Sequence, residues 1–198
     1  RYIIYRDTLA YFTPVSADSI RAVSAAITNF TDNNIFGANL VQDTAHQYFY
    51  TVLAYDIYCN RSAVSNRVGE YDYAIITTTS TSFNLICVPF ETTGITNAVQ
   101  LINAIGISNV RTVNNYQPTS QSFESRFAAG FGVNFAVVPG GVYQVNAAQP
   151  TIFSLAGRVP APGAITYPMV TTATTDYSFL SVPFDREHSF YLAQDVLN

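Results

Sequence analysis

The stretch that decides the fold is Gln47-Tyr48-Phe49-Tyr50-Thr51-Val52-Leu53-Ala54-Tyr55-Asp56. Its tyrosine, phenylalanine, threonine and valine residues favour the pleated backbone of a β-sheet. Successive side chains of a strand point to opposite faces, so this run has two faces of alternating residues. One face carries Tyr48, Tyr50, Val52 and Ala54, and the other carries Phe49, Thr51, Leu53 and Tyr55. The pattern predicts one long strand.

Short segments on either side extend this strand into a first unit. Residues 57–61 predict a turn and residues 62–68 a returning strand, which together make a hairpin. Residues 2–6 predict a further strand because they are rich in tyrosine and isoleucine. Residues 17–28 predict a helix, since apolar residues recur there at helical spacing. Those residues are Ile20, Val23, Ala26 and Ile27.

A family resemblance lies in this first unit. The run Tyr48-x-Tyr50-x-Val52-x-Ala54-x-Asp56-x-x-x-Asn60-x-Ser62-x-x-Ser65-Asn66 resembles the last two strands of a fibronectin type III domain. Asp43-Thr44 stands at the loop before the penultimate strand of that family, and residues 2–6 match its third strand. The resemblance implies an immunoglobulin-like sandwich that lacks its first two strands. The chain departs from the family at Cys59, where a turn glycine is usual, and in a longer insertion at 14–28.

A second pattern, of short strands and one helix, follows residue 70. Thr96 or Asn97 predicts the start of a short helix that ends at Gly106. The apolar face of that helix consists of Ala98, Leu101, Ile102 and Ile105. Strands are predicted over residues 82–90, 110–116, 122–127, 134–138, 142–145 and 151–155, with turns at Pro139-Gly140-Gly141 and Gln149-Pro150.

Two motifs recur at the same offset, from position 73 to 167 and from 85 to 179, which indicates an internal repeat. Tyr73-x-Ile75-Ile76-Thr77-Thr78 returns as Tyr167-x-Met169-Val170-Thr171-Thr172. Leu85-Ile86-Cys87-Val88-Pro89-Phe90 returns as Phe179-Leu180-Ser181-Val182-Pro183-Phe184. Such units are similar to β-rich modules that follow type III domains in large secreted bacterial surface proteins.

The expected fold is mainly β. We expect an incomplete fibronectin type III-like β-sandwich over residues 1–70. A small β-rich repeat unit with one short helix is expected over 71–165, and the start of a second repeat unit over 166–198. Because the chain opens in a strand-like run and closes in a helical pattern, we expect a mature product, a fragment or the ordered part of a longer protein.

Composition narrows the class of protein. Of the 198 residues 48% are hydrophobic and 11% charged, which argues against a disordered chain. The net charge is −4 and lysine is absent, so we expect neither nucleic-acid binding nor polybasic docking on membranes. No apolar run approaches the roughly 20 residues of a membrane span. The β-rich, polar and uncharged mixture predicts an extracellular, cell-surface location. Two glycosylation sequons, at Asn29 and Asn60, add weak support for secretion.

Candidate catalytic and metal-binding residues are few and separated in the sequence. The two histidines, His46 and His188, are interpreted as solvated turn residues, and a weak surface metal site at Asp185, Glu187 and His188 is the minor alternative. Asp32-Asn33-Asn34 lacks the spacing of a calcium loop. The carboxylates of Glu91, Glu124 and Asp176 lie in separate segments. We therefore predict no enzymatic activity, no catalytic residues and no cofactor or metal.

The two cysteines, Cys59 and Cys87, are expected to be unpaired thiols, because the type III interpretation places Cys59 at the pole away from the next unit.

The sequence predicts a structural protein or one that binds other proteins. We expect part of an extracellular, modular surface or fibre-forming protein, whose subunits join by strand or half-domain completion. The expected partners are other copies or segments of a larger surface protein. The alternative is a carbohydrate-binding or adhesive module that recognises polysaccharide through a row of exposed tyrosines.

Overall fold

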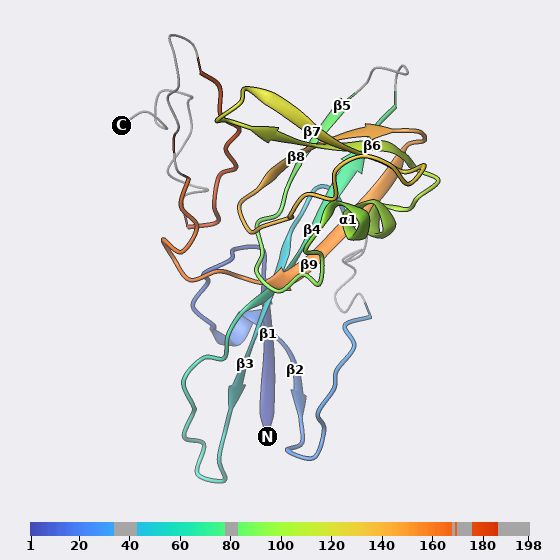
Figure 1. Cartoon of the computed structure of the whole chain (residues 1–198). Coiled ribbons are helices and arrows are strands. Elements are labelled where there is room, and N and C mark those ends of the chain that lie inside the picture. The colour runs from blue at the N-terminus through green and yellow to red at the C-terminus, as the bar shows by residue number, and fades with distance from the viewer. Residues whose placement is uncertain (34–42, 78–82, 168, 170–175, 186–198) are drawn as a thin grey trace.

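The computed structural model describes residues 1–33, 43–77, 83–167, 169 and 176–185 (Figure 1). Two antiparallel sheets form its frame, one of five strands in the order β2-β1-β3-β4-β9 and one of four in the order β5-β8-β6-β7. The strands of the first sheet are β1 (Tyr2–Asp7), β2 (Ser19–Val23), β3 (Tyr48–Ala54), β4 (Val68–Ile75) and β9 (Thr151–Arg158). Those of the second are β5 (Phe83–Cys87), β6 (Val110–Gln117), β7 (Ser122–Phe127) and β8 (Val142–Ala147), and one helix, α1 (Ala98–Ile105), packs with them. The mainly-β prediction with one short helix is confirmed.

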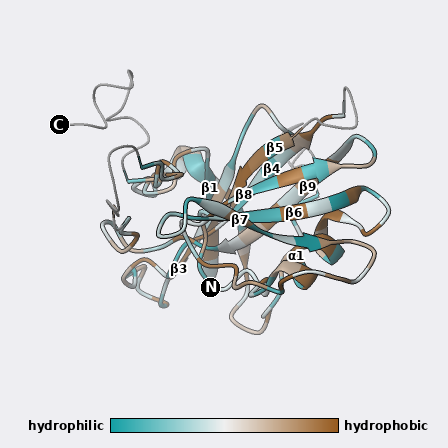
Figure 2. Ribbon diagram, turned by 45° about the horizontal axis from the view of Figure 1, so that its top comes forward, coloured by the Kyte–Doolittle hydropathy of each residue, from teal (hydrophilic) through white to brown (hydrophobic). Residues whose placement is uncertain are grey.

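Strand β3 has the two faces that its alternating sequence predicts. Phe49, Thr51 and Leu53 are almost fully buried on one face, and Phe49 is 0% exposed. β3 pairs with β1 from Tyr2↔Ala54 to Asp7↔Phe49. Figure 2 shows apolar stretches along β5 and polar stretches along β6. Apolar side chains of both sheets form one shared core.

Residues 17–28 do not form the predicted helix. A short 3₁₀ turn (Ser16–Asp18) leads into β2, which pairs with β1 through Ile3↔Ala22 and Ile4↔Arg21. The β-branched side chains of Ile20 and Val23 are stiff and fit a strand better than a helix. An isolated helix of this length is marginal, whereas pairing with β1 satisfies the backbone of the segment directly.

The returning strand predicted over 62–68 is also wrong in its bounds. Two serines hold this segment against β3: the hydroxyls of Ser62 and Ser65 accept hydrogen bonds from the N–H groups of Ala54 and Val52, both at 3.0 Å. Their own N–H groups donate to the carbonyls of Ala54 at 2.9 Å and Val52 at 3.1 Å. Hydroxyls thus take the place of ladder acceptors, and regular pairing with β3 resumes only in β4.

Helix α1 begins and ends at the predicted residues. The side chain of Asn97 accepts a hydrogen bond from the N–H of Gln100 at 3.0 Å, and Gly106 closes the helix with φ +107°. Residues 134–138 do not form the predicted strand, because this segment instead accepts hydrogen bonds from the first turn of the helix. The carbonyl of Phe135 and the side chain of Asn134 accept N–H groups of the first helical turn.

β4 and β9 connect the parts of the chain. They pair over eight positions, from Val68↔Arg158 to Ile75↔Thr151, in the sheet that also contains β1 and β3. The predicted boundary at residue 70 therefore falls inside β4. The packed core includes residues from both sheets and from α1.

Candidate functional site

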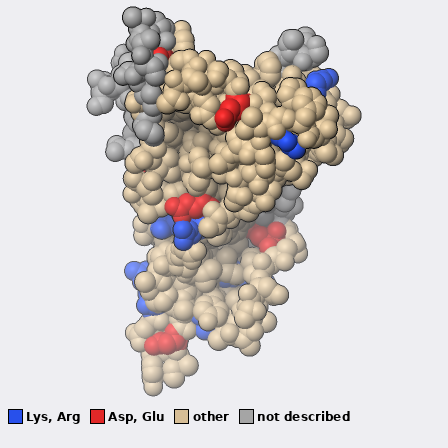
Figure 3. All heavy atoms as spheres, viewed as in Figure 1, with Lys and Arg blue, Asp and Glu red and all other residues tan. Residues whose placement is uncertain are grey.

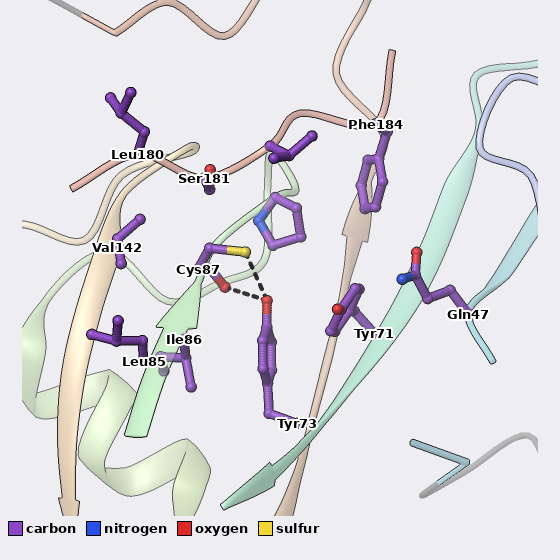
Figure 4. A pocket seen from close by; sticks show the side chains of 12 residues that line it. Gln47, Tyr71, Tyr73, Leu85, Ile86, Cys87, Val142, Leu180, Ser181 and Phe184 are labelled. Atoms are coloured by element: carbon purple, nitrogen blue, oxygen red, sulfur yellow. Dashed lines mark hydrogen bonds between the residues drawn. The ribbon is translucent and has the colours of Figure 1, made fainter. Parts of the chain in front are cut away.

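The repeated motif forms a recognisable contact in its first copy. Tyr73 of β4 donates its phenolic O–H to the carbonyl of Cys87 of β5 at 2.8 Å, and its oxygen lies 2.9 Å from the Cys87 sulfur (Figure 4). Burial raises the pKa of the Tyr73 hydroxyl and of the Cys87 thiol. This contact links β4 of the five-stranded sheet to β5 of the four-stranded sheet.

The second copy makes the same kind of contact at the repeat offset. The hydroxyls of Tyr167 and Ser181 lie 2.6 Å apart, at the positions equivalent to Tyr73 and Cys87. Ser181 also donates to the carbonyl of Gly140 at 3.1 Å. A Cβ atom at Gly140, where φ is +79°, would lie 2.5 Å from Ile165, so glycine allows the second copy to pack on this turn.

Three phenylalanine rings meet where the predicted parts of the chain adjoin. The Phe184 ring packs edge-on against Phe49, with centroids 5.0 Å apart, and lies 5.2 Å from the Phe90 ring. Phe49 and Phe90 are 6.4 Å apart. Phe90 and Phe184 are equivalent in the repeat, so the two copies of the motif meet through the same residue type.

A groove lies beside β5, one of the two outer strands of its sheet, and we call it the β5 groove. It has a volume of about 320 Å³, and Figure 4 shows its side chains. Its lining consists of Gln47, Tyr71, Tyr73, Leu85, Ile86, Cys87, Pro89, Val142, Leu180, Ser181, Val182 and Phe184. Leu85, an outward-facing residue of β5, is 57% exposed. Buried Oε1 of Gln47 has no hydrogen-bond partner within the described residues.

Equivalent residues of the two copies differ sharply in burial. Ile86 and Val88 are 2% and 1% exposed, whereas Leu180 and Val182 are 39% and 49% exposed. In the first copy, β8 pairs with β5 through Ile86↔Tyr143 and contributes to the core. Among the described residues, the second copy has no strand in the place of β8. Its apolar side chains therefore lie open.

The candidate chemical residues within the described ranges make local contacts. His46 lies 2.9 Å from Asp43, and the hydrogen bonds from His46 and Tyr48 lower the pKa of that carboxyl group. Asp32 pairs with Arg6 at 2.8 Å. Asn34, Glu187 and His188 lie outside the described residues.

The separated carboxylates have local partners. Glu91 pairs with Arg158, Glu124 accepts from Gln117 at 2.6 Å, and Asp185 accepts the N–H of Gly163 at 2.8 Å. Across the described ranges, no group of three or more His, Cys, Asp or Glu residues is placed to hold a metal ion.

Sequence reasoning missed a pair of carboxyl groups two residues apart on β4. Ser154 donates its hydroxyl to Asp72, while Glu70 Oε1 and Asp72 Oδ2 are buried without partners in the described structure. Burial raises the pKa of Glu70 to about 7, and the nearby charges of Asp72 and Asp43 raise it further. The signal was present as acidic residues at alternate positions of one strand.

Replacing Glu70 with glutamine is expected to remove a pH dependence of stability. The pKa of Glu70 is 4.5 in its ordinary state and about 7 in the folded protein. Between these pH values the folded protein therefore keeps a proton on Glu70 that the unfolded chain releases. The free energy of unfolding of the native protein should fall as pH rises through this window, by about 1–2 kcal/mol after allowance for solvent screening. Urea denaturation should find Glu70→Gln equal to wild type near pH 4.5 and more stable at pH 8. A constant difference across this range would contradict the assignment.

The two cysteines are both free thiols, Cys59 exposed and Cys87 partly buried. Cys59 should react with a disulfide reagent such as dithiobis-nitrobenzoate roughly 100-fold faster than Cys87, whose thiol is buried and whose pKa is raised. The rates of Cys59→Ser and Cys87→Ser variants assign each phase. Equal rates would contradict the burial of Cys87.

No protein-family model, curated protein sequence or solved structure matches this chain. Within the described ranges, no helix combines the length and apolar character needed to cross a membrane. On the face drawn in Figure 3, charged side chains are scattered among a large uncharged surface.

Proposed function

We propose that this chain is a non-enzymatic structural or interaction protein. It would form part of an extracellular, modular surface or fibre-forming protein whose subunits associate by completing one another's sheets. The observation that carries this proposal is the contrast between the buried Ile86 and Val88 and their exposed counterparts Leu180 and Val182. Apolar residues patterned for a core, yet open to solvent, favour association with a further chain segment.

The contacts of the repeat support a modular arrangement. Each copy places a tyrosine hydroxyl against the residue fourteen positions later, Tyr73 against Cys87 and Tyr167 against Ser181. The type III resemblance of residues 1–70 is part of the proposal. It is supported by the antiparallel pairing of β1 with β3 and by the serines that hold residues 61–66 beside β3.

The polysaccharide alternative has less support. It predicts a row of exposed tyrosines on one face. Among the described residues, the exposed tyrosines are Tyr58 and Tyr177. Tyr177 hydrogen-bonds through its backbone to Gln121, beside β7, whereas Tyr58 lies in the loop after β3, so they do not form such a row.

Hydroxyl-radical footprinting read by mass spectrometry tests the proposal. As protein concentration rises, oxidation of Leu180 and Val182 should fall several-fold, because association covers them. Ile107, which is also exposed but lies after α1, serves as the internal control and should not change. Unchanged oxidation of all three residues, with the particle remaining at the 21.7 kDa of one chain, would contradict the proposal.

A further inference from the structure

The chain has two Asn-x-Ser/Thr triplets, which begin at Asn29 and Asn60, and the structure places them in different surroundings. Such a triplet is an acceptor for an N-linked glycan through its asparagine amide, and the hydroxyl two positions later takes part in recognition. A glycan is bulky and hydrated, so the asparagine that carries it has to lie at the surface. The exposure and the hydrogen bonds of the two triplets therefore indicate which one is free to be modified.

The first triplet lies in the irregular segment after β2, where exposure alternates along the chain. Asn29 and Thr31 are exposed, whereas Phe30 and Asp32 are partly buried. The Asp32 carboxylate holds the segment against the sheet by accepting a hydrogen bond from Arg6 at 2.8 Å. This alternation is that of an extended segment, in which residues two apart share a side. The amide of Asn29 and the hydroxyl of Thr31 are therefore presented to solvent together.

The second triplet begins in the loop after β3, and the Asn60 side chain is bound within that loop. Its Nδ2 donates to one carboxylate oxygen of Asp56 at 2.8 Å, and the Asn60 N–H donates to the other oxygen at 2.8 Å. These hydrogen bonds from Asn60 lower the pKa of the Asp56 carboxyl group, so the carboxylate is charged at neutral pH. The nitrogen that a glycan would join is thus held by a charged acceptor.

The hydroxyl of the second triplet is also engaged. Ser62 donates it to the carbonyl of Ala63 at 2.7 Å, and the same oxygen accepts the N–H of Ala54 at 3.0 Å. The contact of Asn60 with Asp56 joins residues only four positions apart. Hairpins form in about 1–10 μs, whereas a chain is synthesised at about 5–20 residues per second. These local contacts are therefore open to the nascent chain as well as to the folded protein.

We propose that Asn29 is an N-glycosylation site and that Asn60 stays largely unmodified. In the transfer, the amide nitrogen of Asn29 forms a bond to C1 of the first sugar and gives up one proton. The bond between C1 and the diphosphate of a lipid-linked oligosaccharide breaks, and the lipid diphosphate leaves. This inference rests on the extracellular placement in the proposed function and adds a covalent modification to it.

A glycan at Asn29 is compatible with the proposed association. Asn29 lines a hollow of about 640 Å³, which is also lined by side chains of β1, β2 and β3 in the five-stranded sheet. Among the described residues, the β5 groove, which contains Leu180 and Val182, shares no lining residue with this hollow. We therefore expect the glycan to leave the surface of association free.

Cell-free translation with microsomal membranes, of the full chain behind a cleavable secretion signal, tests the assignment. Enzymatic deglycosylation in heavy-oxygen water turns each modified asparagine into a labelled aspartate, which mass spectrometry locates. Wild type should carry the label on Asn29 and several-fold less of it on Asn60. Asn29→Gln should remove most of the glycan from the chain. Asn66→Gln, at an exposed asparagine outside both triplets, is the matched control and should change nothing.

A second variant tests the reason for the difference. Asp56→Ala frees the Asn60 amide, so the ratio of modified to unmodified Asn60 should rise several-fold. Asp7→Ala is its control, because Asp7 also fixes a turn, by accepting the N–H of Leu9 at 2.9 Å, but has no contact with either triplet among the described hydrogen bonds. Asp7→Ala should leave the modification of Asn60 as it is in wild type.

The outcomes separate this inference from the proposed function. Equal modification of the two asparagines in wild type, or an unmodified Asn29, would overturn the inference. An Asn60 that is no better modified in Asp56→Ala than in wild type would contradict the protection by Asp56. A chain that is modified at Asn29 yet never associates keeps the inference and contradicts the proposed self-association. A chain that associates but is not modified does the reverse.

Discussion

Replacing Phe49 with alanine is expected to lower the free energy of unfolding by about 3–5 kcal/mol, the cost of removing a fully buried aromatic ring. The ring is 0% exposed and contacts the rings of Phe90 and Phe184. Those three residues come from the three predicted parts of the chain. Losing Phe49 therefore leaves a cavity at the junction, which the surrounding strands close only in part.

Urea denaturation measures this loss. Phe83→Ala is the matched control, because Phe83 lies on β5 with half of its side chain exposed and should cost less than about 1 kcal/mol. Because Phe49 joins segments that are distant in sequence, we also expect the native chain to unfold in one transition. Equal losses for the two variants, or separate transitions for the parts, would contradict the role given to this ring.

The second large effect is expected at Gly69, the residue opposite Phe49 in the β3–β4 register. A Cβ atom there would lie 2.5 Å from Cδ1 of Phe49 and 2.9 Å from Cε1 of Phe90. Neither ring has free space, since both are fully buried. Gly69→Ala should therefore lower the free energy of unfolding by about 1–3 kcal/mol, the usual cost of overpacking a core.

A double variant distinguishes this clash from a loss of glycine's flexibility. In Phe49→Ala/Gly69→Ala the added methyl enters space that the ring has left, so the combined loss should be smaller than the sum of the two single losses. We expect a coupling of at least about 1 kcal/mol, as contacting residues show in double-mutant cycles. Strict additivity would mean that the cost of Gly69→Ala arises elsewhere.

The sequence predicts best where a local signal coincides with the tertiary structure. Asn97 and Gly106 bound α1 because cap geometry is set by a few adjacent residues. Strands β6 and β7 also lie where they are predicted, within one residue at each end. The same reasoning fails at Ile20 and Val23, whose helical spacing is overridden by pairing with β1.

The candidate site is less predictable than the fold. The repeat identifies Tyr73 and Cys87 as counterparts of Tyr167 and Ser181, and the structure gives both pairs a contact. The β5 groove itself joins Gln47, β5 and residues 180–184, which are far apart in sequence. Only tertiary packing brings such segments together, so no pattern within one segment indicates the groove.

The pair of carboxyl groups on β4, Glu70 and Asp72, is likewise only partly predictable from the sequence. Glu70 and Asp72 share a face by the period of a strand, which sequence alone can indicate. The raised pKa of Glu70 depends first on burial, then on the charge of Asp72, and also on the charge of Asp43 from another segment. A spacing of two residues predicts proximity, but the degree of burial decides the titration.

The mass of the native particle, measured by light scattering over a range of concentrations, tests the central claim most directly. The account predicts masses that rise with concentration through multiples of the 21.7 kDa chain. A particle of 21.7 kDa at every concentration would contradict it.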